Sequence, residues 1–298
     1  MATKNKQKRK HKQKNKPKPS TPKWTYTAAT ADRHILYGLS VQNVEAEIDF
    51  VDERFEIIRG RKAALLREDF CGTANTAAEW VQRRDSNHAV GLDIDEETLE
   101  WGARHNVGPL SEEQQERVRL FRKDVMDPPE AARNVDVVLA MNFSYWLFQT
   151  RELMRQYFER VRDSLAPDGV FFLDHYGGSE AMTECQDDKF VGEHDNDPDQ
   201  FTYVWDQNSY NPITGEMQCY IHFEFPDETR MDKAFDYKWR LWTLPEIQEL
   251  LKEAGFKNVT VYWEGTDEDD EEEGNGVFEP TTVGDADPAY ITYITAEK

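Results

Sequence analysis

The stretch from Glu68 to Ala74 carries the clearest chemical signal in this 298-residue sequence. It reads Glu-Asp-Phe-Cys-Gly-Thr-Ala and follows an apolar run that predicts a strand, 63–66. A second apolar run, 89–92, ends at Asp93, which lies 21 residues after Gly72. A turn of small residues lets a cofactor approach the backbone, and an acid that ends the next strand can accept both hydroxyls of a ribose. The pattern therefore predicts a site for a nucleoside-containing cofactor.

The loop is poor in glycine for a dinucleotide site. Only Gly72 stands where the dinucleotide-binding fingerprint has three glycines. Phe70 and Ala74 occupy the flanking positions, where side chains would crowd a pyrophosphate. A cofactor without phosphate tolerates these side chains better, so NAD is the alternative rather than the first choice.

Strand-like runs alternate with helical periodicity through the first two thirds of the chain. A helical segment, 32–60, precedes the first strand and shows apolar residues at spacings of three and four. The expected strands are 63–66, 89–92, 119–121, 135–141 and 170–173, and the expected helices between them are 76–83, 96–105 and 151–165. Such alternation is typical of βαβ units on a parallel sheet.

The pattern changes after residue 176. Aromatic-rich alternating segments at 201–205, 217–225 and 234–242 predict antiparallel strands, which places a β insertion at about 177–240. A capping box from Thr243 to Glu246 then begins a helix. Two final strands are expected at 259–263 and 290–295, with an acidic loop at about 265–288 between them.

From about Asp32 to the C-terminus, the order of these motifs resembles the class I S-adenosylmethionine-dependent methyltransferases, specifically a branch with a Glu-Asp-Phe-Cys-Gly-Thr first motif. The resemblance implies a Rossmann-like α/β fold in residues 24–298. A mostly parallel seven-stranded sheet would carry helices on both faces and the antiparallel insertion. It also implies S-adenosylmethionine as the cofactor, S-adenosylhomocysteine as the product, and no metal.

The same resemblance assigns roles to individual residues. The family's first motif usually reads acid-x-Gly-x-Gly-x-Gly, which places Glu68 as the acid and Gly72 as the middle glycine, while Phe70 and Ala74 depart from the outer two. Asp93 would hold the ribose, and Asn142 would lie beside the sulfonium. The full set of implied cofactor contacts is Glu68, Phe70, Gly72, Asp93, Ile94, Asp124, Val125 and Asn142, of which Ile94, Asp124 and Val125 would surround the adenine. Each of these residues also has a structural interpretation, as a helix cap, an ion-pair partner or a packed side chain.

Acceptor chemistry leaves a weaker signal, because the methyl of a sulfonium is already activated and the protein mainly has to align the acceptor. Candidate catalytic residues follow the fourth and fifth strands: Tyr145 in Asn142–Tyr145, and His175 in Asp174–Gly178. His175 is the best candidate for a general base, with a structural hydrogen-bonding role as its alternative.

Charge is unevenly distributed. Residues 1–23 hold ten Lys or Arg and no acid, so the net charge of −22 leaves −32 on residues 24–298. The tail is expected to be disordered, and residues 4–18 are the only candidate contact for nucleic acid.

Without an apolar run of spanning length or a signal sequence, we expect a cytoplasmic protein, or a nuclear one if it is eukaryotic. The three widely spaced cysteines predict neither a disulfide nor a zinc site.

The sequence thus predicts methyl transfer to a small-molecule N or O acceptor, enclosed by Asp32–Gln42 and the β insertion. One alternative is an RNA or protein methyltransferase that is recruited through the basic tail. Another is a cofactor-fold scaffold without catalysis, which the departures at Phe70 and Ala74 suggest. The oligomeric state and the identity of the acceptor are left open.

Overall fold

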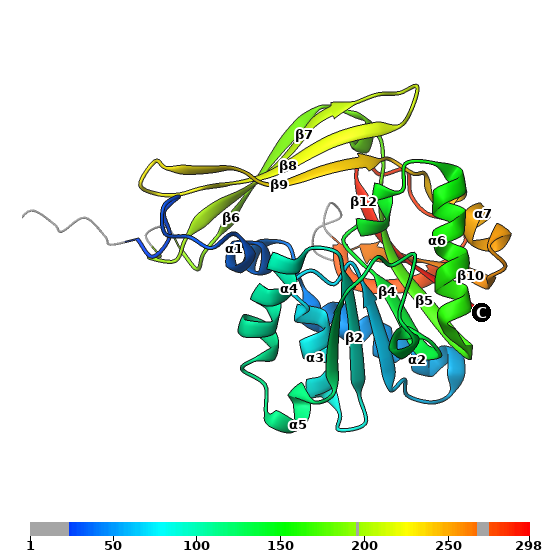
Figure 1. Ribbon diagram of the computed structural model, residues 1–298. Helices are drawn as coiled ribbons and strands as arrows, with labels where there is room; N and C mark the ends of the chain where they lie inside the picture. The colour runs from blue at the N-terminus through cyan, green and yellow to red at the C-terminus, as the bar shows by residue number, and fades with distance from the viewer. Residues whose placement is uncertain (1–23, 195–196, 267–273) are drawn as a thin grey trace, which may run out of the picture.

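The computed structural model describes residues 24–194, 197–266 and 274–298, so the predicted basic tail and acidic run lie outside the described residues. Its centre is an eight-stranded sheet in the order β11-β10-β12-β5-β4-β1-β2-β3 (Figure 1). The strands are β1 (Leu65–Asp69), β2 (His88–Asp93), β3 (Val118–Arg122), β4 (Val135–Ala140), β5 (Leu165–Gly177), β10 (Lys257–Thr266), β11 (Gly274–Thr281) and β12 (Tyr290–Glu297). Strands β1 to β5 pair in parallel, whereas β12 lies antiparallel between β5 and β10. This arrangement confirms the predicted fold class, with one strand more than expected.

Helices cover both faces of this sheet. They are α1 (Arg33–Ser40), α2 (Val44–Arg59), α3 (Asn75–Arg83), α4 (Glu96–Gly102), α5 (Glu112–Gln115), α6 (Arg151–Ser164) and α7 (Leu244–Glu253). Alternate residues of a strand point to opposite faces, so Phe171 of β5 packs in the core with α6 and α7, and Phe172 packs in the core with α2 and α3. Strands β2, β4 and β5 are consequently mostly buried, which explains their apolar runs, whereas the edge strand β3 has no fully buried side chain.

A second, four-stranded antiparallel sheet forms the predicted insertion. Its strands are β6 (Cys185–Val191), β7 (Phe201–Tyr210), β8 (Glu216–Glu224) and β9 (Arg230–Arg240), paired in that order. This sheet extends across one end of the parallel sheet, and α1 lies beneath it (Figure 1). Leu36 of α1 packs into the core of the insertion with Phe201 and Phe223.

Three details differ from the sequence prediction. The segment 32–60 forms two helices, α1 and α2, with a break at 41–43, because α1 turns away to pack against the insertion. Strand β6 was missed, and β11 lies inside the predicted loop 265–288. Both are edge strands with mostly exposed side chains, so neither shows the apolar alternation of a half-buried strand.

Cys71, Cys185 and Cys219 are free thiols. Among the described residues, no helix is both long and apolar enough to span a membrane.

Candidate active site

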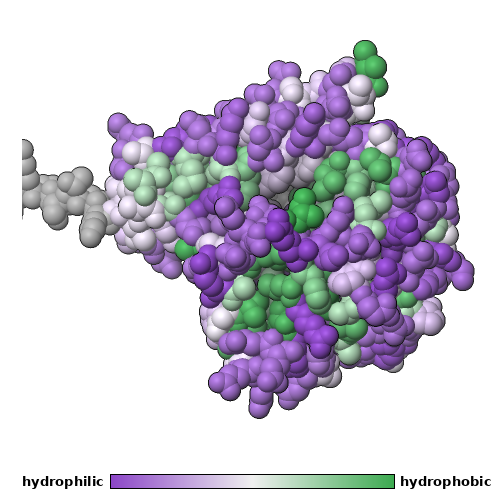
Figure 2. All heavy atoms as spheres, viewed as in Figure 1, coloured by the Kyte–Doolittle hydropathy of each residue, from purple (hydrophilic) through white to green (hydrophobic). Residues whose placement is uncertain are grey.

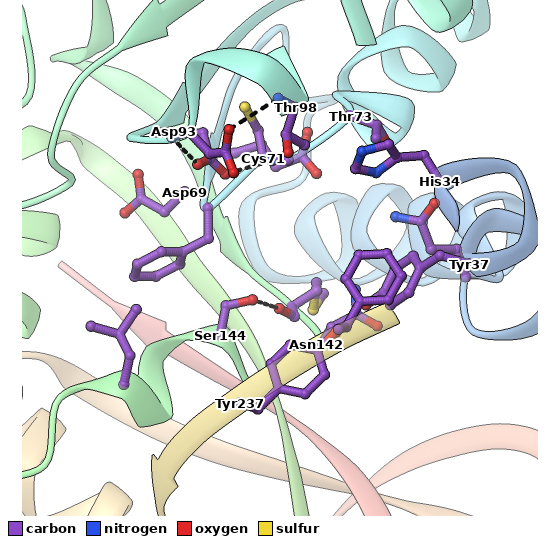
Figure 3. A pocket seen from close by; sticks show the side chains of 18 of the residues that line it. His34, Tyr37, Asp69, Cys71, Thr73, Asp93, Thr98, Asn142, Ser144 and Tyr237 are labelled. Carbon is purple, nitrogen blue, oxygen red and sulfur yellow. Dashed lines mark hydrogen bonds between the residues drawn. The ribbon is translucent and has the colours of Figure 1, made fainter. Parts of the chain in front are cut away.

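A cavity of about 340 Å³ lies at the carboxyl ends of β1, β2 and β4. One part of its wall comes from the loops after these strands, where Gly72, Asp93 and Asn142 lie. Another part comes from α1 and from β9 of the insertion. Figure 3 shows Cys71, Asp93 and Thr98 gathered on one side, and Tyr37, Asn142 and Tyr237 on another. On the outer surface, apolar side chains gather in the hollow below the antiparallel sheet (Figure 2).

The loop after β1 has an unusual backbone. Phe70, Gly72 and Ala74 have φ of 56°, 50° and 56°, so all three alternate positions of the Gly-x-Gly-x-Gly pattern are left-handed. Only glycine adopts this region without a steric cost. Phe70 and Ala74 therefore keep the backbone shape that the usual glycines would provide, and the Phe70 ring packs against Phe148 and Tyr157.

Asp93 fixes this loop to the end of β2. Its Oδ2 accepts a hydrogen bond from the Gly72 amide at 2.8 Å, and its Oδ1 accepts one from the Asp95 amide at 2.9 Å. Each carboxylate oxygen has a second lone pair, so Asp93 can still accept from a ligand hydroxyl in the cavity.

Glu68 and Asp69 differ in their charge partners although they are neighbours. Asp69 is paired with Arg67 at 2.6 Å and accepts from the Tyr157 hydroxyl at 2.9 Å. Glu68 accepts from the Ala77 amide at 3.1 Å and makes no ion pair with any described residue. Burial raises the pKa of Glu68 to about 8, against the opposing hydrogen bonds from Thr76 and Ala77. A carboxyl without a counter-charge thus borders the cavity.

Asp174 shapes the loop after β4. Its two carboxylate oxygens accept from the amides of Asn142 at 2.7 Å and Phe143 at 3.0 Å. Both residues have left-handed φ, at 56° and 54°, and these two bonds stabilise that conformation. Burial raises the pKa of Asp174 to about 7. The side chain of Asn142 is placed at the cavity wall by this loop.

Helix α1 closes the cavity from the side. Its N-cap, Asp32, accepts from the His34 amide at 2.8 Å and from the indole of Trp101, in α4, at 2.7 Å. His34 and Tyr37 then face the cavity, and the Tyr37 ring contacts that of Phe235 on β9 at 4.9 Å between centroids. The helix thus links the parallel-sheet body to the insertion.

Five of the sequence-predicted cofactor residues line the cavity: Glu68, Phe70, Gly72, Asp93 and Asn142. Three others do not. Ile94 is 69% exposed, Asp124 is exposed and accepts from the Met126 amide, and Val125 is buried in the core beside Arg67.

The two candidate catalytic residues lie outside the cavity wall. Tyr145 is fully buried, and its hydroxyl donates to the Asp174 carbonyl at 2.7 Å. His175 is fully buried with the Trp146 ring against it, and burial lowers its pKa to about 3. Such an imidazole stays neutral and is a weak base. We therefore correct the expectation that these side chains face the acceptor.

The sequence predicted that residues 32–42 and the β insertion enclose the site, but it did not assign individual site residues in these segments. His34, Tyr37, Tyr237 and Trp239 line the cavity, although they are distant in sequence from the motif loop. The sequence does contain a pattern that points to Tyr237 and Trp239. Aromatic residues at 235, 237 and 239 alternate with Asp236 and Lys238, so the three rings share one face of a strand. The sequence pattern alone does not show whether this face lines a binding site or packs in a hydrophobic core.

Residues 71–171 match the model of a family described as a methyltransferase domain. This part of the chain is therefore a methyltransferase domain. No curated protein matches the sequence.

Several solved structures share the fold of nearly the whole chain. An S-adenosylmethionine-dependent methyltransferase from Clostridium acetobutylicum is 16% identical, with 89% of this chain and 96% of that chain covered and a TM-score of 0.60. An amino pentose methyltransferase from Micromonospora echinaspora is 17% identical, with 89% and 95% covered and a TM-score of 0.60. A sugar N-methyltransferase from Streptoalloteichus is 14% identical, with 96% and 99% covered and a TM-score of 0.59. The chain has the class I methyltransferase fold that these proteins share.

Proposed function

We propose that this protein transfers a methyl group from S-adenosylmethionine to a small-molecule N or O acceptor. The proposal rests on one observation: the motif residues and the residues of α1 and β9 line the same cavity. A cofactor bound by the motif loop would have its reactive end inside a space that the lid elements cover. In open α/β sheets, ligands bind in this position, at the carboxyl ends of the strands.

The residues present fit the cofactor. Asp93 offers paired carboxylate oxygens, already oriented by two backbone amides, for the two ribose hydroxyls. Gly72 lines the cavity without a side chain, so a ligand can approach its backbone closely. Glu68 supplies a carboxyl that lacks a counter-charge, and the cofactor carries cationic groups. When bound, S-adenosylmethionine supplies an activated methyl group.

Enclosure supports a small acceptor. The insertion and α1 contribute one side of the cavity, and they contact each other there through the rings of Tyr37 and Phe235. A long polymer would need an open groove rather than a covered space. Two of the structural neighbours are named as an amino pentose methyltransferase and a sugar N-methyltransferase, which is in keeping with a small acceptor.

Methyl transfer can be tested with S-adenosylmethionine that carries a radioactive methyl group. The native protein is incubated in parallel with a pool of small amines and alcohols, with total RNA, and with a protein extract. We expect label in the small-molecule fraction, and little label with the Asp93→Asn variant. Asp127→Asn, which changes an 83% exposed acid outside the cavity wall, is the matched control and should keep activity. Label in the RNA or protein fraction alone would contradict the proposed acceptor class.

A further inference from the structure

The part of the cavity that faces the lid has aromatic walls. Phe235, Tyr237 and Trp239 alternate along β9 and all point to the cavity. The Tyr237 and Trp239 rings stack at 4.5 Å between centroids, and the Phe235 and Tyr237 rings lie at 6.5 Å and nearly parallel. Tyr37 of α1 interacts with Tyr237 through a side-chain hydrogen bond. We call Tyr37, Tyr237 and Trp239 the ring wall.

The ring wall is held rigidly from behind. The Trp239 ring meets the edge of Trp146 at 5.9 Å and 80°, and that of Phe143 at 6.4 Å and 88°. Trp205 of β7 lies 6.2 Å from both Tyr237 and Trp239. Because Phe143 belongs to the loop that Asp174 holds, the ring wall and Asn142 are parts of one packed unit. A ligand against these rings would therefore lie beside Asn142, where Figure 3 also places Tyr37 and Tyr237.

The charges around this part of the cavity are one-sided. The described residues of its wall include four acids, Glu68, Asp69, Asp93 and Asp95, and neither lysine nor arginine. Only Asp69 has a cationic partner inside the protein core. Behind the wall, the carboxyls of Glu47 and Asp174 are buried. Neither carboxyl makes an ion pair with a described residue. The described wall therefore offers no lysine or arginine to an anionic acceptor, whereas a cationic acceptor would meet no like charge of a lysine or arginine there.

On the described wall, no histidine lies near Asn142 to take a proton from an alcohol. His34 is the one histidine of the described wall, and in Figure 3 it lies near Thr73 rather than near Asn142. Asp174 is buried behind the loop after β4 and is not part of the described cavity wall. Burial raises the pKa of the Cys71 thiol well above its usual value. A neutral alcohol is a weak nucleophile, so a base must take its proton during the transfer. A neutral amine attacks through its nitrogen lone pair without the help of a base.

We propose that the acceptor is a small amine whose ammonium form is recognised by the ring wall of Tyr37, Tyr237 and Trp239. This inference rests on the proposed methyltransferase function and names its substrate class. Cations bind the faces of Trp and Tyr rings within about 6 Å of the centroid. The ammonium first releases one proton to water, and the neutral nitrogen then attacks the methyl carbon. The new N–C bond forms as the S–C bond breaks, the sulfur keeps that electron pair as a neutral thioether, and the methylated nitrogen carries the positive charge.

The test compares two probes of the same shape and different charge. Choline carries a trimethylammonium group, and 3,3-dimethylbutan-1-ol is its neutral counterpart. Each is titrated by calorimetry into the full-length protein saturated with S-adenosylhomocysteine. We expect choline to bind about two- to thirtyfold more tightly, since one cation–π contact is worth roughly 0.5–2 kcal/mol. Equal or tighter binding of the neutral alcohol would overturn the inference, as would binding of neither probe at tens of millimolar.

Three variants distinguish loss of cation recognition by the ring wall from a general loss of folded structure. Tyr237→Phe keeps the ring and should retain the choline preference, whereas Trp239→Leu should remove most of it. Phe190→Leu makes the same kind of change at a 48% exposed ring on β6, outside the cavity wall, and should behave as the native protein does. If Trp239→Leu fails to fold, the native comparison of the two probes still decides.

Binding of S-adenosylhomocysteine itself tests the methyltransferase function separately from the amine acceptor. Failure to bind S-adenosylhomocysteine would contradict the methyltransferase function itself. Normal binding of S-adenosylhomocysteine without a choline preference would overturn only the amine acceptor.

Discussion

At the scale of single residues, the loop after β1 shows how a motif can change its side chains and keep its shape. Phe70 and Ala74 hold left-handed backbone at a cost of about 1–2 kcal/mol each, because a Cβ atom is crowded in this region. Hydrogen bonds from the Cys71 amide to the Leu92 carbonyl and from the Gly72 amide to Asp93 offset part of this cost. The Phe70 ring also gains packing that a glycine could not make.

The pKa of Glu68 predicts a pH-dependent affinity for the cofactor. In the free protein this carboxyl holds its proton below about pH 8. A bound cation favours the carboxylate, so binding below that pH releases a proton, and the affinity should rise with pH and level off near 8. One released proton allows at most roughly a tenfold change per pH unit.

Calorimetric titration with S-adenosylmethionine at several pH values measures this dependence. Glu68→Gln removes the titrating group and keeps its shape, so its profile should lose the contribution of the carboxyl, while any ionisation of the ligand remains in both profiles. Identical profiles for the two proteins would show that Glu68 does not respond to the bound cation.

The sequence predicted the site residues that belong to one local motif. It did not predict those that come together only through the tertiary structure. Glu68, Gly72 and Asp93 could be predicted because a strand, a turn and the next strand place them together. His175 and Asp174 are adjacent on β5, so their side chains point to opposite faces. Which face would meet the cavity depends on helices and strands that are distant in sequence. The same limit applies to Tyr37 and Trp239, which meet only because α1 packs under the insertion.

At the scale of elements, α1 is the part that completes the cavity. It is short, at eight residues, so its stability depends on its cap and its contacts rather than on its own propensity. Asp32 serves both needs, since it caps the helix and accepts from Trp101. We therefore regard this aspartate as the attachment of the lid to the parallel-sheet body.

Asp32→Ala should loosen α1. We expect a loss of stability of about 1 kcal/mol from the missing cap and a lower affinity for the acceptor. Hydrogen exchange of residues 33–40 should become faster, whereas exchange in β4 should not change. Asp32→Asn keeps one acceptor oxygen for the helix cap but none for the Trp101 indole, so its exchange rates should lie between those of Asp32→Ala and the native protein. Unchanged exchange of α1 in Asp32→Ala would contradict this role.

The elements of the parallel sheet could be predicted because both of their faces are buried. Strands β1, β2 and β4 appear in the sequence as apolar runs, and α6 appears as an apolar stripe. Strands β6 and β11 could not be recognised in this way, since each lies at a sheet edge and exposes most of its side chains. The break between α1 and α2 reflects a contact with the insertion, which no local pattern records.

At the scale of the whole molecule, the site belongs to the acidic part of the chain. Residues 24–298 carry a net charge of −32, and the described cavity wall extends from His34 to Trp239. A strongly acidic body repels nucleic acid phosphates at long range. Recognition of RNA would therefore depend on residues 1–23, which contribute nothing to the described wall.

Deletion of residues 1–23 should leave cofactor binding and small-molecule methyl transfer within about twofold of the full-length values, because the residues that we propose to bind the cofactor and the acceptor all remain in 24–298. Both quantities can be compared by calorimetry and by release of S-adenosylhomocysteine. Loss of RNA binding together with loss of activity would instead favour a macromolecular acceptor.

The most direct test of the central claim is calorimetric titration of the purified protein with S-adenosylmethionine, S-adenosylhomocysteine and NADH, alongside the Asp93→Ala variant. The account predicts that both sulfur compounds bind, that NADH does not, and that Asp93→Ala weakens binding at least about tenfold, because it removes a charged acceptor worth roughly 1.5–3 kcal/mol. A folded protein that binds neither sulfur compound, or that binds NADH alone, would contradict it.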